Sequence, residues 1–315
     1  MTSLAPHAAE FHHEAFMYAG DEEFLAGTTS FVREALAAEQ PILVVLPAPR
    51  LELLRSQLNG ELDSVLFADM DEVGVNPARI IPAWRDFVSE RFVPGRGLRG
   101  IGEPVFPERS SDELTECHRH ESLLNLAFAD TPGFKLLCPY DTRALEPDVV
   151  EHARRTHPYV FEGGVRRKSS EYGGIEAAAA PFDEPLPEAP ADADELAFEV
   201  ATLDLVRMFV ATHARDARLS ATRTEDLLLA AHELASNSVR HGGGAGVMRI
   251  WVDADALICE VRDRGWIDKP LVGRERPGVN ENGGYGLWLV NQLCELVQLR
   301  SYPHGSVVRL RVRRG

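Results

Sequence analysis

A proline- and alanine-rich acidic segment is the feature of this sequence that most limits how the chain can fold. Residues 176–194, EAAAAPFDEPLPEAPADAD, contain four prolines, many alanines and several acids, but no Lys or Arg. Such a composition buries too little apolar surface to offset the conformational entropy lost on ordering. We therefore predict a semi-extended linker between two domains, 1–175 and 195–315, each of ordinary domain size.

The charge balance excludes several classes of function. The 315 residues include 33 Lys and Arg against 49 Asp and Glu, which gives a formal net charge of −16. Binding to nucleic acid or to anionic lipid needs a basic surface, so we expect neither as a direct partner. The aliphatic runs are far shorter than the roughly 20 residues of a membrane helix, and the N-terminus lacks the regions of a signal peptide. The predicted location is the cytoplasm.

The first domain alternates helical and strand patterns along its length. Short, nearly continuous apolar runs are predicted as strands at 42–46, 65–69, 98–102 and 134–140. Helical patterns near 50–58, 78–92 and 112–129 separate them. Apolar strands that alternate with helices indicate an α/β domain with a mostly parallel sheet covered on both faces.

The second domain has a different pattern. Helices are predicted at about 195–214 and 223–241, strands at 247–253, 256–263, 296–302 and 306–314, and a helix starting near 287. In the last strand Val308 and Leu310 alternate with arginines, so one face should meet a core and the other should meet water. Helices segregated against an antiparallel or mixed sheet indicate an α+β sandwich.

The strongest chemical signal is HELASNSVRHG at 232–242. With about 3.6 residues per turn, Glu233, Asn237 and His241 fall on one narrow stripe of a helix, and apolar residues occupy the wider opposite face. A carboxylate one turn from a carboxamide can hold hydrated Mg²⁺ through the amide oxygen and draw a proton from an attacking hydroxyl or water. A solvated polar helix face is the alternative, and the motif taken alone favours it, because short motifs match by chance.

A second signal is DRG at 263–265, at the end of a predicted strand. Asp263 can accept a hydrogen bond from an exocyclic amine, and Gly265 lets a flat ring approach the backbone closely. An ordinary Asp-x-Gly turn is the alternative.

The third signal is a glycine-rich stretch, GGYGL at 283–287, in which Gly284 and Gly286 precede an amphipathic helix. Backbone N–H groups at such a helix start form a natural anion cradle. A hinge or a simple helix-entry turn is the alternative.

In this order and spacing the motifs resemble the GHKL family of ATP-binding domains (gyrase, Hsp90, histidine kinase, MutL) over nearly all of 195–315. The matching positions are Glu233, Asn237 and His241 for the N box, Asp263 and Gly265 for the first glycine box, Gly284, Gly286 and Leu287 for the second, and Gly305 and Ser306 before the last strand. The resemblance implies a Bergerat-type α+β sandwich with ATP and Mg²⁺ as cofactors.

The resemblance also implies a role for each of these residues. Asn237 would ligate Mg²⁺, and Glu233 would be the general base. Asp263 would hold the adenine N6 amine, with Ser306 supporting the ring. The remaining nucleotide-binding positions would be His241, Gly265, Gly284, Gly286 and Leu287, the two last glycines lining the phosphates beneath a mobile lid at about 266–284.

A single predicted helix at 195–214 that runs straight into the next helix resembles the RsbW/SpoIIAB type of anti-sigma factors. That resemblance implies an ATP-dependent protein serine/threonine kinase whose partners are a sigma factor and a STAS-type anti-sigma antagonist; a homodimer stays open as an alternative to a monomer. A sensor histidine kinase, the second alternative, needs a phosphoacceptor on a helical hairpin. Neither HARRTHP at 152–158 nor His232 leaves room for that hairpin.

One departure from the pattern bears on catalysis. Kinases of this type often place an arginine in or beside the second glycine box, where it meets the terminal phosphate. Here Asn282 and Tyr285 stand in that neighbourhood, and the nearest bases are Arg274 and Arg276. Because losing a charge clamp on a transferring phosphoryl group is costly, a non-catalytic, nucleotide-dependent anti-sigma binding module is the first alternative.

The first domain resembles the MEDS sensory domains, which are related to degenerate RecA/KaiC-like folds, over about 11–173. The segments that carry this resemblance are FHHEAFMYAGDEEFLAGTTSFVREALAAEQPILVVLP at 11–47, ECHRHESLLNLAF at 116–128 and LLCPYDT at 136–142. No G-x-x-x-x-G-K-[ST] sequence occurs in the chain, so a phosphate cradle of that kind is absent. The resemblance implies a sensor that acts on the ATP-binding domain through the linker.

Histidines and acids in the first domain raise the question of a metal or ligand site. The candidates are His12, His13 and Glu14, together with His118, His120 and Glu121. On a helix His118 and Glu121 are neighbours, but His120 points elsewhere, and no C-x-x-C or H-E-x-x-H pattern indicates zinc. We therefore interpret them as partly buried structural histidines. The four cysteines, which lie far apart in the sequence, are expected as buried free thiols.

Overall fold

The computed structural model describes residues 10–58, 60–174, 184–278 and 284–314. Contacts divide the chain into two compact units, an N-terminal unit, Met1–Ala178, and a C-terminal unit, Ala179–Gly315. Within the described residues, no helix is both long and apolar enough to span a lipid bilayer.

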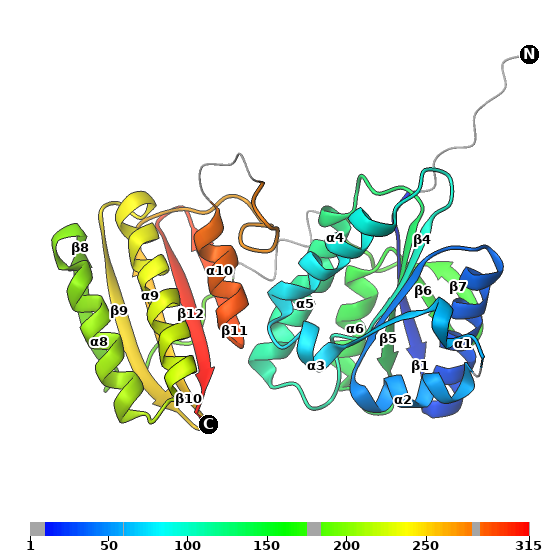
Figure 1. Ribbon diagram of the computed structural model, residues 1–315, viewed down its shortest axis with the longest axis horizontal. Helices are drawn as coiled ribbons and strands as arrows, with labels where there is room; N and C mark the ends of the chain where they lie inside the picture. Colours follow the sequence, from blue (N-terminus) through cyan, green and yellow to red (C-terminus); the bar gives the residue numbers. More distant parts are fainter. Residues whose placement is uncertain (1–9, 59, 175–183, 279–283, 315) are drawn as a thin grey trace, which may run out of the picture. The chain divides into compact units, whose positions relative to one another are not determined.

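A seven-stranded sheet forms the centre of the N-terminal unit (Figure 1). Its strands are β1 (His12–Tyr18), β2 (Ile42–Leu46), β3 (Leu66–Asp69), β4 (Leu98–Gly102), β5 (Phe134–Asp141), β6 (Tyr159–Glu162) and β7 (Val165–Lys168). They are ordered β3-β2-β4-β5-β1-β6-β7, and every neighbouring pair is parallel except β6 and β7. The predicted mostly parallel sheet is confirmed.

Helices cover both faces of this sheet, as parallel strands require. They are α1 (Asp21–Ala37), α2 (Ala48–Gln57), α3 (Met70–Val73), α4 (Ile80–Arg91), α5 (Ser111–Ala127) and α6 (Pro147–Thr156), with 3-10 turns at Leu62–Ser64 and Pro77–Arg79. Figure 1 shows α1 and α2 on one side of the strands and α4, α5 and α6 on the other. Strand β1 was not among the predicted strands, because its buried positions include His13 and Glu14, which break the apolar pattern.

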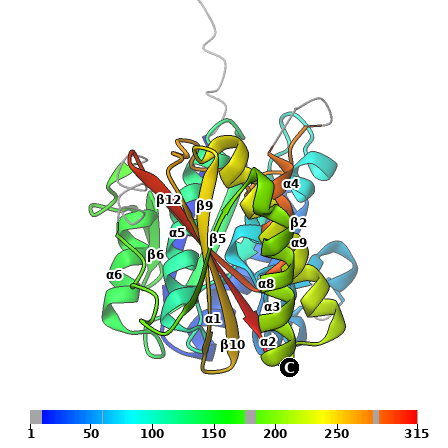
Figure 2. The same ribbon diagram turned by 90° about the vertical axis from the view of Figure 1, so that its left-hand side faces the viewer.

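The C-terminal unit contains a five-stranded antiparallel sheet in the order β11-β12-β10-β9-β8. The strands are β8 (Asp194–Glu199), β9 (Ala245–Asp253), β10 (Ala256–Asp263), β11 (Leu296–Tyr302) and β12 (Gly305–Arg313). The helices are α8 (Leu203–Asp216), α9 (Ala221–His241) and α10 (Tyr285–Leu293), after a 3-10 turn at Val200–Thr202. Figure 2 shows α8 and α9 together on one side of the strands, which is the expected α+β sandwich.

The start of this unit corrects one expectation. The helix predicted at about 195–214 begins only at Leu203, and residues 194–199 instead form strand β8 at the edge of the sheet. Phe198 explains the difference, because its side chain is 2% exposed and belongs to the core between the sheet and the helices. Burial of this aromatic ring at the sheet edge outweighs the helical pattern of the flanking residues.

The opposite face of the sheet corrects a second expectation. Arg309 on β12, predicted to meet water, is 8% exposed and pairs with Glu260 on β10, which is fully buried. The described part of the acidic segment covers them: Arg309 donates to the carbonyl of Pro187, and Arg300 donates to that of Glu184. Residues 184–190 are therefore fastened to the sheet rather than free; residues 176–183 of the predicted linker lie outside the described residues.

Candidate functional site

Helix α9 presents the acid and amide of the first motif along one edge. The helix begins at Ser220, whose hydroxyl accepts a hydrogen bond from the backbone N–H of Arg223. Its apolar face, which includes Leu227 and Leu234, is buried against the sheet. Glu233 and Asn237 lie at the margin of this buried face and are half-buried, whereas His241 at the end of the helix is exposed.

The second glycine motif lies directly against these two side chains. A Cβ atom added to Gly286 would be 2.9 Å from Asn237 Nδ2 and 3.0 Å from Glu233 Oε2. Any side chain at Gly286 would displace one of them. Gly284, which caps the start of α10, has φ +87°, a left-handed conformation that glycine adopts without strain. The first turn of α10 therefore lies against the carboxylate and amide of α9.

Asp263, at the end of β10, is held in a defined orientation. Its Oδ2 accepts a hydrogen bond from Ser238 Oγ at 2.6 Å, and its Oδ1 accepts one from the backbone N–H of Gly265 at 2.8 Å. Ser306 Oγ in turn donates to the Gly265 carbonyl at 2.8 Å, which fixes the turn that follows Asp263. A carboxylate oxygen has room for more than one donor, so Asp263 can still accept from a ligand amine.

Gly242 leaves space for this carboxylate. A Cβ atom added there would be 2.4 Å from Asp263 Cγ and 2.5 Å from its Oδ2, closer than real contacts allow. The glycine after α9 and the aspartate after β10 therefore touch, although 20 residues separate them in the sequence.

A single cavity of about 410 Å³ joins the motifs. It is lined by Leu234, Asn237, Ser238, His241, Gly242, Val261, Asp263, Gly265, Trp266, Ile267, Asp268, Lys269, Val272, Gly284, Gly286, Leu287, Ser306 and Val308. All eight positions that the resemblance implies for the nucleotide are in this set. The proposed base, Glu233, is not among the lining residues and lies beside Gly286. The volume is in the range of small-molecule sites.

Several residues of the cavity were not singled out in the sequence analysis. Ser238 donates a hydrogen bond to Asp263, and Gly242 leaves space for that carboxylate. Ser301, which is outside the cavity lining, contacts Ser306 Oγ at 2.8 Å. Ser238 and Gly242 belong to the HELASNSVRHG motif, so their position beside Asn237 and His241 was an available signal. Lys269 had no such signal, because it follows the predicted first glycine box in an irregular segment.

The two arginines of the predicted lid segment, about 266–284, are Arg274 and Arg276, and neither lines the cavity. Arg274 is 4% exposed, and the guanidinium of Arg276 lies 5.4 Å from the centre of the Trp288 ring. Neither belongs to the described residues that line the cavity. Asn282 and the rest of 279–283 lie outside the described residues.

The N-terminal unit has a cavity of its own, of about 440 Å³, at the carboxyl ends of β1, β2, β4 and β5. Tyr18 donates its hydroxyl hydrogen to Glu103 Oε1 at 2.9 Å, and Arg50 donates to Asp141 at 3.0 Å. Burial raises the pKa of Glu103 to about 8, so this carboxyl is largely protonated at neutral pH. The carboxyl edge of parallel strands is where open α/β sheets bind ligands.

Comparisons with known families agree with both resemblances. Residues 12–158 match the family described as MEDS, MEthanogen/methylotroph, DcmR Sensory domain. Residues 196–312 match the family described as histidine kinase-like ATPase domain. The predicted pairing of these two domains is confirmed.

Solved structures similar to the chain are distant in sequence. The RsbU and RsbW domains of Rv1364c from Mycobacterium tuberculosis are 14% identical over 67% of this chain and 50% of theirs, with a TM-score of 0.30. The chain thus spans half the length of that structure. The histidine kinase AdeS of Acinetobacter baumannii is 13% identical over 39% of this chain and 68% of its own, with a TM-score of 0.24. No curated protein matches the chain.

Proposed function

We propose that this chain, which joins a MEDS sensory domain to a histidine kinase-like ATPase domain, binds Mg·ATP in the 410 Å³ cavity and phosphorylates a Ser or Thr of a protein partner. In this proposal the partner is a STAS-type anti-sigma antagonist, and its phosphorylation state decides whether a sigma factor is held. The observation that carries the proposal is that one cavity gathers residues from all three motifs.

The residues present fit the proposed cofactor. Asn237 offers an amide oxygen for Mg²⁺, and Asp263, fixed by Ser238, offers an acceptor for the adenine amine. Gly284 and Gly286 at the start of α10 leave space and backbone N–H groups for phosphate oxygens, where the helix dipole favours negative charge. ATP would supply the phosphoryl group.

Glu233 is the proposed general base. Its Oε2 lies beside Gly286, and Asn237 is one helical turn further along the same edge of α9. A hydroxyl of the partner that enters between them could give its proton to this carboxylate as it attacks the terminal phosphate. The side chain is half-buried at the margin of the core, so its position is defined while it stays accessible.

A phosphotransfer assay tests the proposal. The full-length protein is incubated with radiolabelled ATP and its STAS-type antagonist, and label on a Ser or Thr of the antagonist is the expected result. Glu233→Ala should abolish the label without changing nucleotide affinity. Glu225→Ala is the matched control, because Glu225 is an exposed acid on the same helix, more than two turns away. Equal loss of label in both variants would count against Glu233 as the base.

A non-catalytic binding module is the alternative that a specific observation favours. Among the described residues that line the cavity there is no arginine, and Arg276 lies against Trp288 instead. A site without an arginine clamp can bind nucleotide yet stabilise a transferring phosphoryl group poorly. Nucleotide-dependent capture of the antagonist or of a sigma factor, with no label transferred, would identify this module.

A sensor histidine kinase is less well supported. The residues before α8 form an extended segment over 184–193, strand β8 and a 3-10 turn, so no helical hairpin precedes the ATPase domain in that part of the chain. His157 of the HARRTHP stretch is fully buried, so its ring is not accessible to a phosphoryl donor and does not fit a phosphoacceptor role. Phosphohistidine on the protein itself would overturn the serine/threonine assignment.

For the N-terminal unit we propose a sensory role on a degenerate RecA/KaiC-like sheet. The cavity at Glu103 and Arg50 is the proposed ligand site, because it lies at the carboxyl edge of the parallel strands. Ligand binding there would change the activity of the ATPase domain. A ligand that protects Glu103→Gln from heat as well as it protects the wild-type protein would argue against this location.

A further inference from the structure

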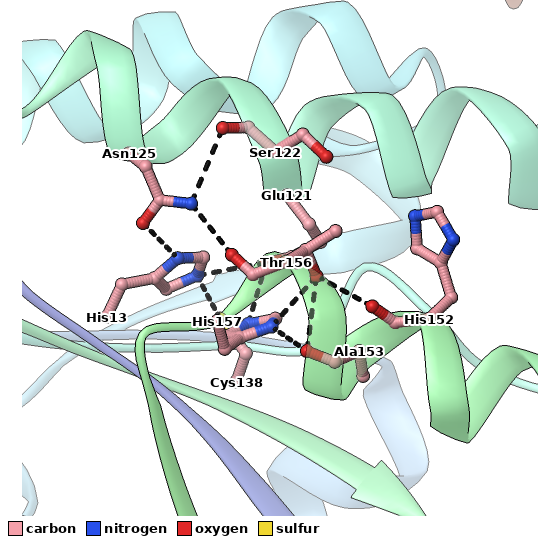
Figure 3. Close-up of polar contacts among 9 residues, drawn as sticks. All are labelled: His13, Glu121, Ser122, Asn125, Cys138, His152, Ala153, Thr156 and His157. Carbon is pink, nitrogen blue, oxygen red and sulfur yellow. Dashed lines mark hydrogen bonds and ion pairs between the residues drawn. The ribbon is translucent and has the colours of Figure 1, made fainter. Parts of the chain in front are cut away.

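Four side chains from four separate segments meet inside the N-terminal unit. They are His13 on β1, Glu121 on α5, Cys138 on β5 and His157 just after α6. None is more than 1% exposed, and one nitrogen, oxygen or sulfur atom from each lies within 4.8 Å of those of the other three. Figure 3 shows the two imidazole rings and the carboxylate turned toward one another, with Cys138 below them.

This arrangement departs from our interpretation of the histidine-rich segments. His13 and Glu121 are completely buried and in contact, whereas His118 stacks on His152 with ring centres 4.0 Å apart. The other two members, Cys138 and His157, come from segments that were not considered together. Cys138 reaches His13 because β5 pairs with β1 and places Cys138 opposite Ala15, two residues from His13. His157 lies two residues before Tyr159, which pairs with Glu14 on the other side of β1.

Hydrogen bonds determine which nitrogen of His13 carries its hydrogen. Asn125 Nδ2 donates to the Thr156 carbonyl at 2.8 Å, so the amide oxygen of Asn125 must face His13. That oxygen is 3.1 Å from His13 Nδ1 and can only accept. The hydrogen of a neutral His13 ring therefore lies on Nδ1, and Nε2 presents a lone pair to Glu121 Oε2 at 3.0 Å.

His157 repeats the pattern from the other side. Its Nδ1 is 2.8 Å from the carbonyl oxygen of Ala153, which only accepts, so this nitrogen is the donor. Its Nε2 lies 3.1 Å from the same Glu121 Oε2. Two imidazole lone pairs thus converge on one carboxylate oxygen, and Cys138 Sγ is 3.4 Å from His13 Nε2. Lone pairs of two neutral imidazoles and a carboxylate at these distances repel unless a proton or a metal ion lies among them, and the Cys138 thiol hydrogen can serve only one of them at a time.

We propose that this cluster is a binding site for one divalent transition-metal ion of the zinc class, with His13 Nε2, His157 Nε2, a Glu121 oxygen and Cys138 Sγ as ligands. Nitrogen, oxygen and sulfur ligands of this kind are those that Zn²⁺ takes in tetrahedral sites, at about 2.0–2.3 Å. Such bonds put neighbouring ligand atoms roughly 3.3–3.8 Å apart, so the observed 3.0, 3.1 and 3.4 Å contacts need to open slightly. Any pair nearer the 4.8 Å limit of the cluster needs to close as the ion binds.

Charge and surroundings also fit a metal ion. A thiolate and a carboxylate neutralise a divalent cation, so the loaded site is uncharged and suits a fully buried position. Cys138 releases its thiol proton to solvent when the ion binds. Each imidazole donates its other N–H to an oxygen, as metal-bound histidines do. Glu121 Oε1, buried and without a hydrogen-bond partner among the described residues, is a further free acceptor.

Four protein ligands leave no open position, so the ion would be structural rather than catalytic. It would fasten β1, α5, β5 and the end of α6 to one another. Metal binding would therefore raise the thermal stability of the N-terminal unit, because only the folded chain brings these residues together.

Titration of the untagged full-length protein with Co²⁺ tests the site. After removal of metals by a chelator, we expect one Co²⁺ per chain, with the visible bands of a tetrahedral ion and a thiolate-to-cobalt charge-transfer band. Cys138→Ser should remove the charge-transfer band. Cys117→Ser is the matched control, because Cys117 is equally buried on α5 but its thiol donates to the Pro104 carbonyl instead.

Two other residues, Asn125, which orients a ligand, and Glu121, which is a ligand, allow independent tests. Asn125→Ala, which frees the His13 ring, should lower Co²⁺ affinity by about 10- to 100-fold. Zn²⁺ should raise the thermal midpoint of the wild-type protein and of Cys117→Ser but not of Glu121→Gln. A wild-type protein that binds no stoichiometric Co²⁺, or binds it without the charge-transfer band, would overturn the proposal. Retention of the band in Cys138→Ser would overturn it as well, and if that variant does not fold, the spectra of the wild-type protein and Cys117→Ser decide.

Discussion

The contact between Gly242 and Asp263 allows a sharp test of the nucleotide site through a residue that need not touch the nucleotide. Gly242 has φ −92° and ψ 19°, which alanine adopts without strain, so Gly242→Ala adds one methyl group and leaves the backbone unchanged. The new Cβ would be 2.4 Å from Asp263 Cγ. Ordinary contact needs roughly 1 Å more, so the carboxylate must retreat by about that distance.

The displacement of the Asp263 carboxylate allows the expected loss of nucleotide affinity to be calculated. The Asp263 carboxylate accepts hydrogen bonds of 2.6 Å from Ser238 and 2.8 Å from Gly265, and a retreat of about 1 Å lengthens them past the limit of a hydrogen bond. A ligand amine positioned for the present carboxylate would lose its acceptor too. A hydrogen bond to a charged group contributes about 1.5–3 kcal/mol, so nucleotide affinity should fall roughly 10- to 150-fold.

Isothermal titration with a non-hydrolysable ATP analogue, in the presence of Mg²⁺, measures this loss. The control is a double-mutant cycle: in an Asp263→Ala background the carboxylate is already gone, so adding Gly242→Ala should lower affinity no further. Circular dichroism checks that each variant keeps its helical content. Wild-type affinity in Gly242→Ala, or losses that add in the double variant, would refute the assignment of Asp263 as the adenine acceptor.

Three further predictions concern the two units. Ser238→Ala removes one hydrogen bond that orients Asp263 and should weaken nucleotide binding about 2- to 10-fold. The control is Ser236→Ala, which should bind as the wild type does, because the Ser236 hydroxyl lies 3.5 Å from His232 and not against Asp263. Equal titration curves for the two variants would contradict the role of Ser238. Asn237→Ala should abolish the Mg²⁺ dependence of nucleotide affinity, and a variant that responds to magnesium as the wild type does would exclude Asn237 as a ligand. Burial gives Glu103 a pKa of about 8 in the folded chain, whereas the unfolded carboxyl ionises near its ordinary value of 4.5. The free energy of unfolding should therefore fall as pH rises between these values, by on the order of 5 kcal/mol. Glu103→Gln should flatten that slope in thermal melts recorded across this range, and an unchanged slope would show that another group is responsible.

The spacing of residues within one helix or strand was enough to predict which side chains of the site share a face. Glu233 and Asn237 are four residues apart on a helix, so the helical repeat alone puts them on one edge. The alternation of Val308 and Leu310 with polar residues likewise gave the inward face of β12. These relations depend on backbone periodicity, which any segment with that pattern shares.

Strand β1 and the burial of Arg309 were not predicted, because sequence periodicity alone does not show which polar side chains are buried. Strand β1 lies inside the sheet, but its buried His13 and Glu14 are polar, so the segment lacks the apolar pattern from which a buried strand is predicted. Arg309 carries a charge on the face predicted to meet water, yet Glu260 and the 184–190 segment bury it. In both cases a partner distant in the sequence satisfies the polar group, and only that partner makes its burial possible.

The sequence by itself therefore determined the two-domain division, the layers of each domain and the residue types available for chemistry. Tertiary structure decided which of those residues meet: Asp263 with Ser238 and Gly242, Gly286 with Glu233, and the buried cluster around Glu121. The physical reason is that helix and strand geometry constrains neighbours a few residues apart, whereas contacts across 100 residues depend on strand order and helix packing, which the whole chain selects together.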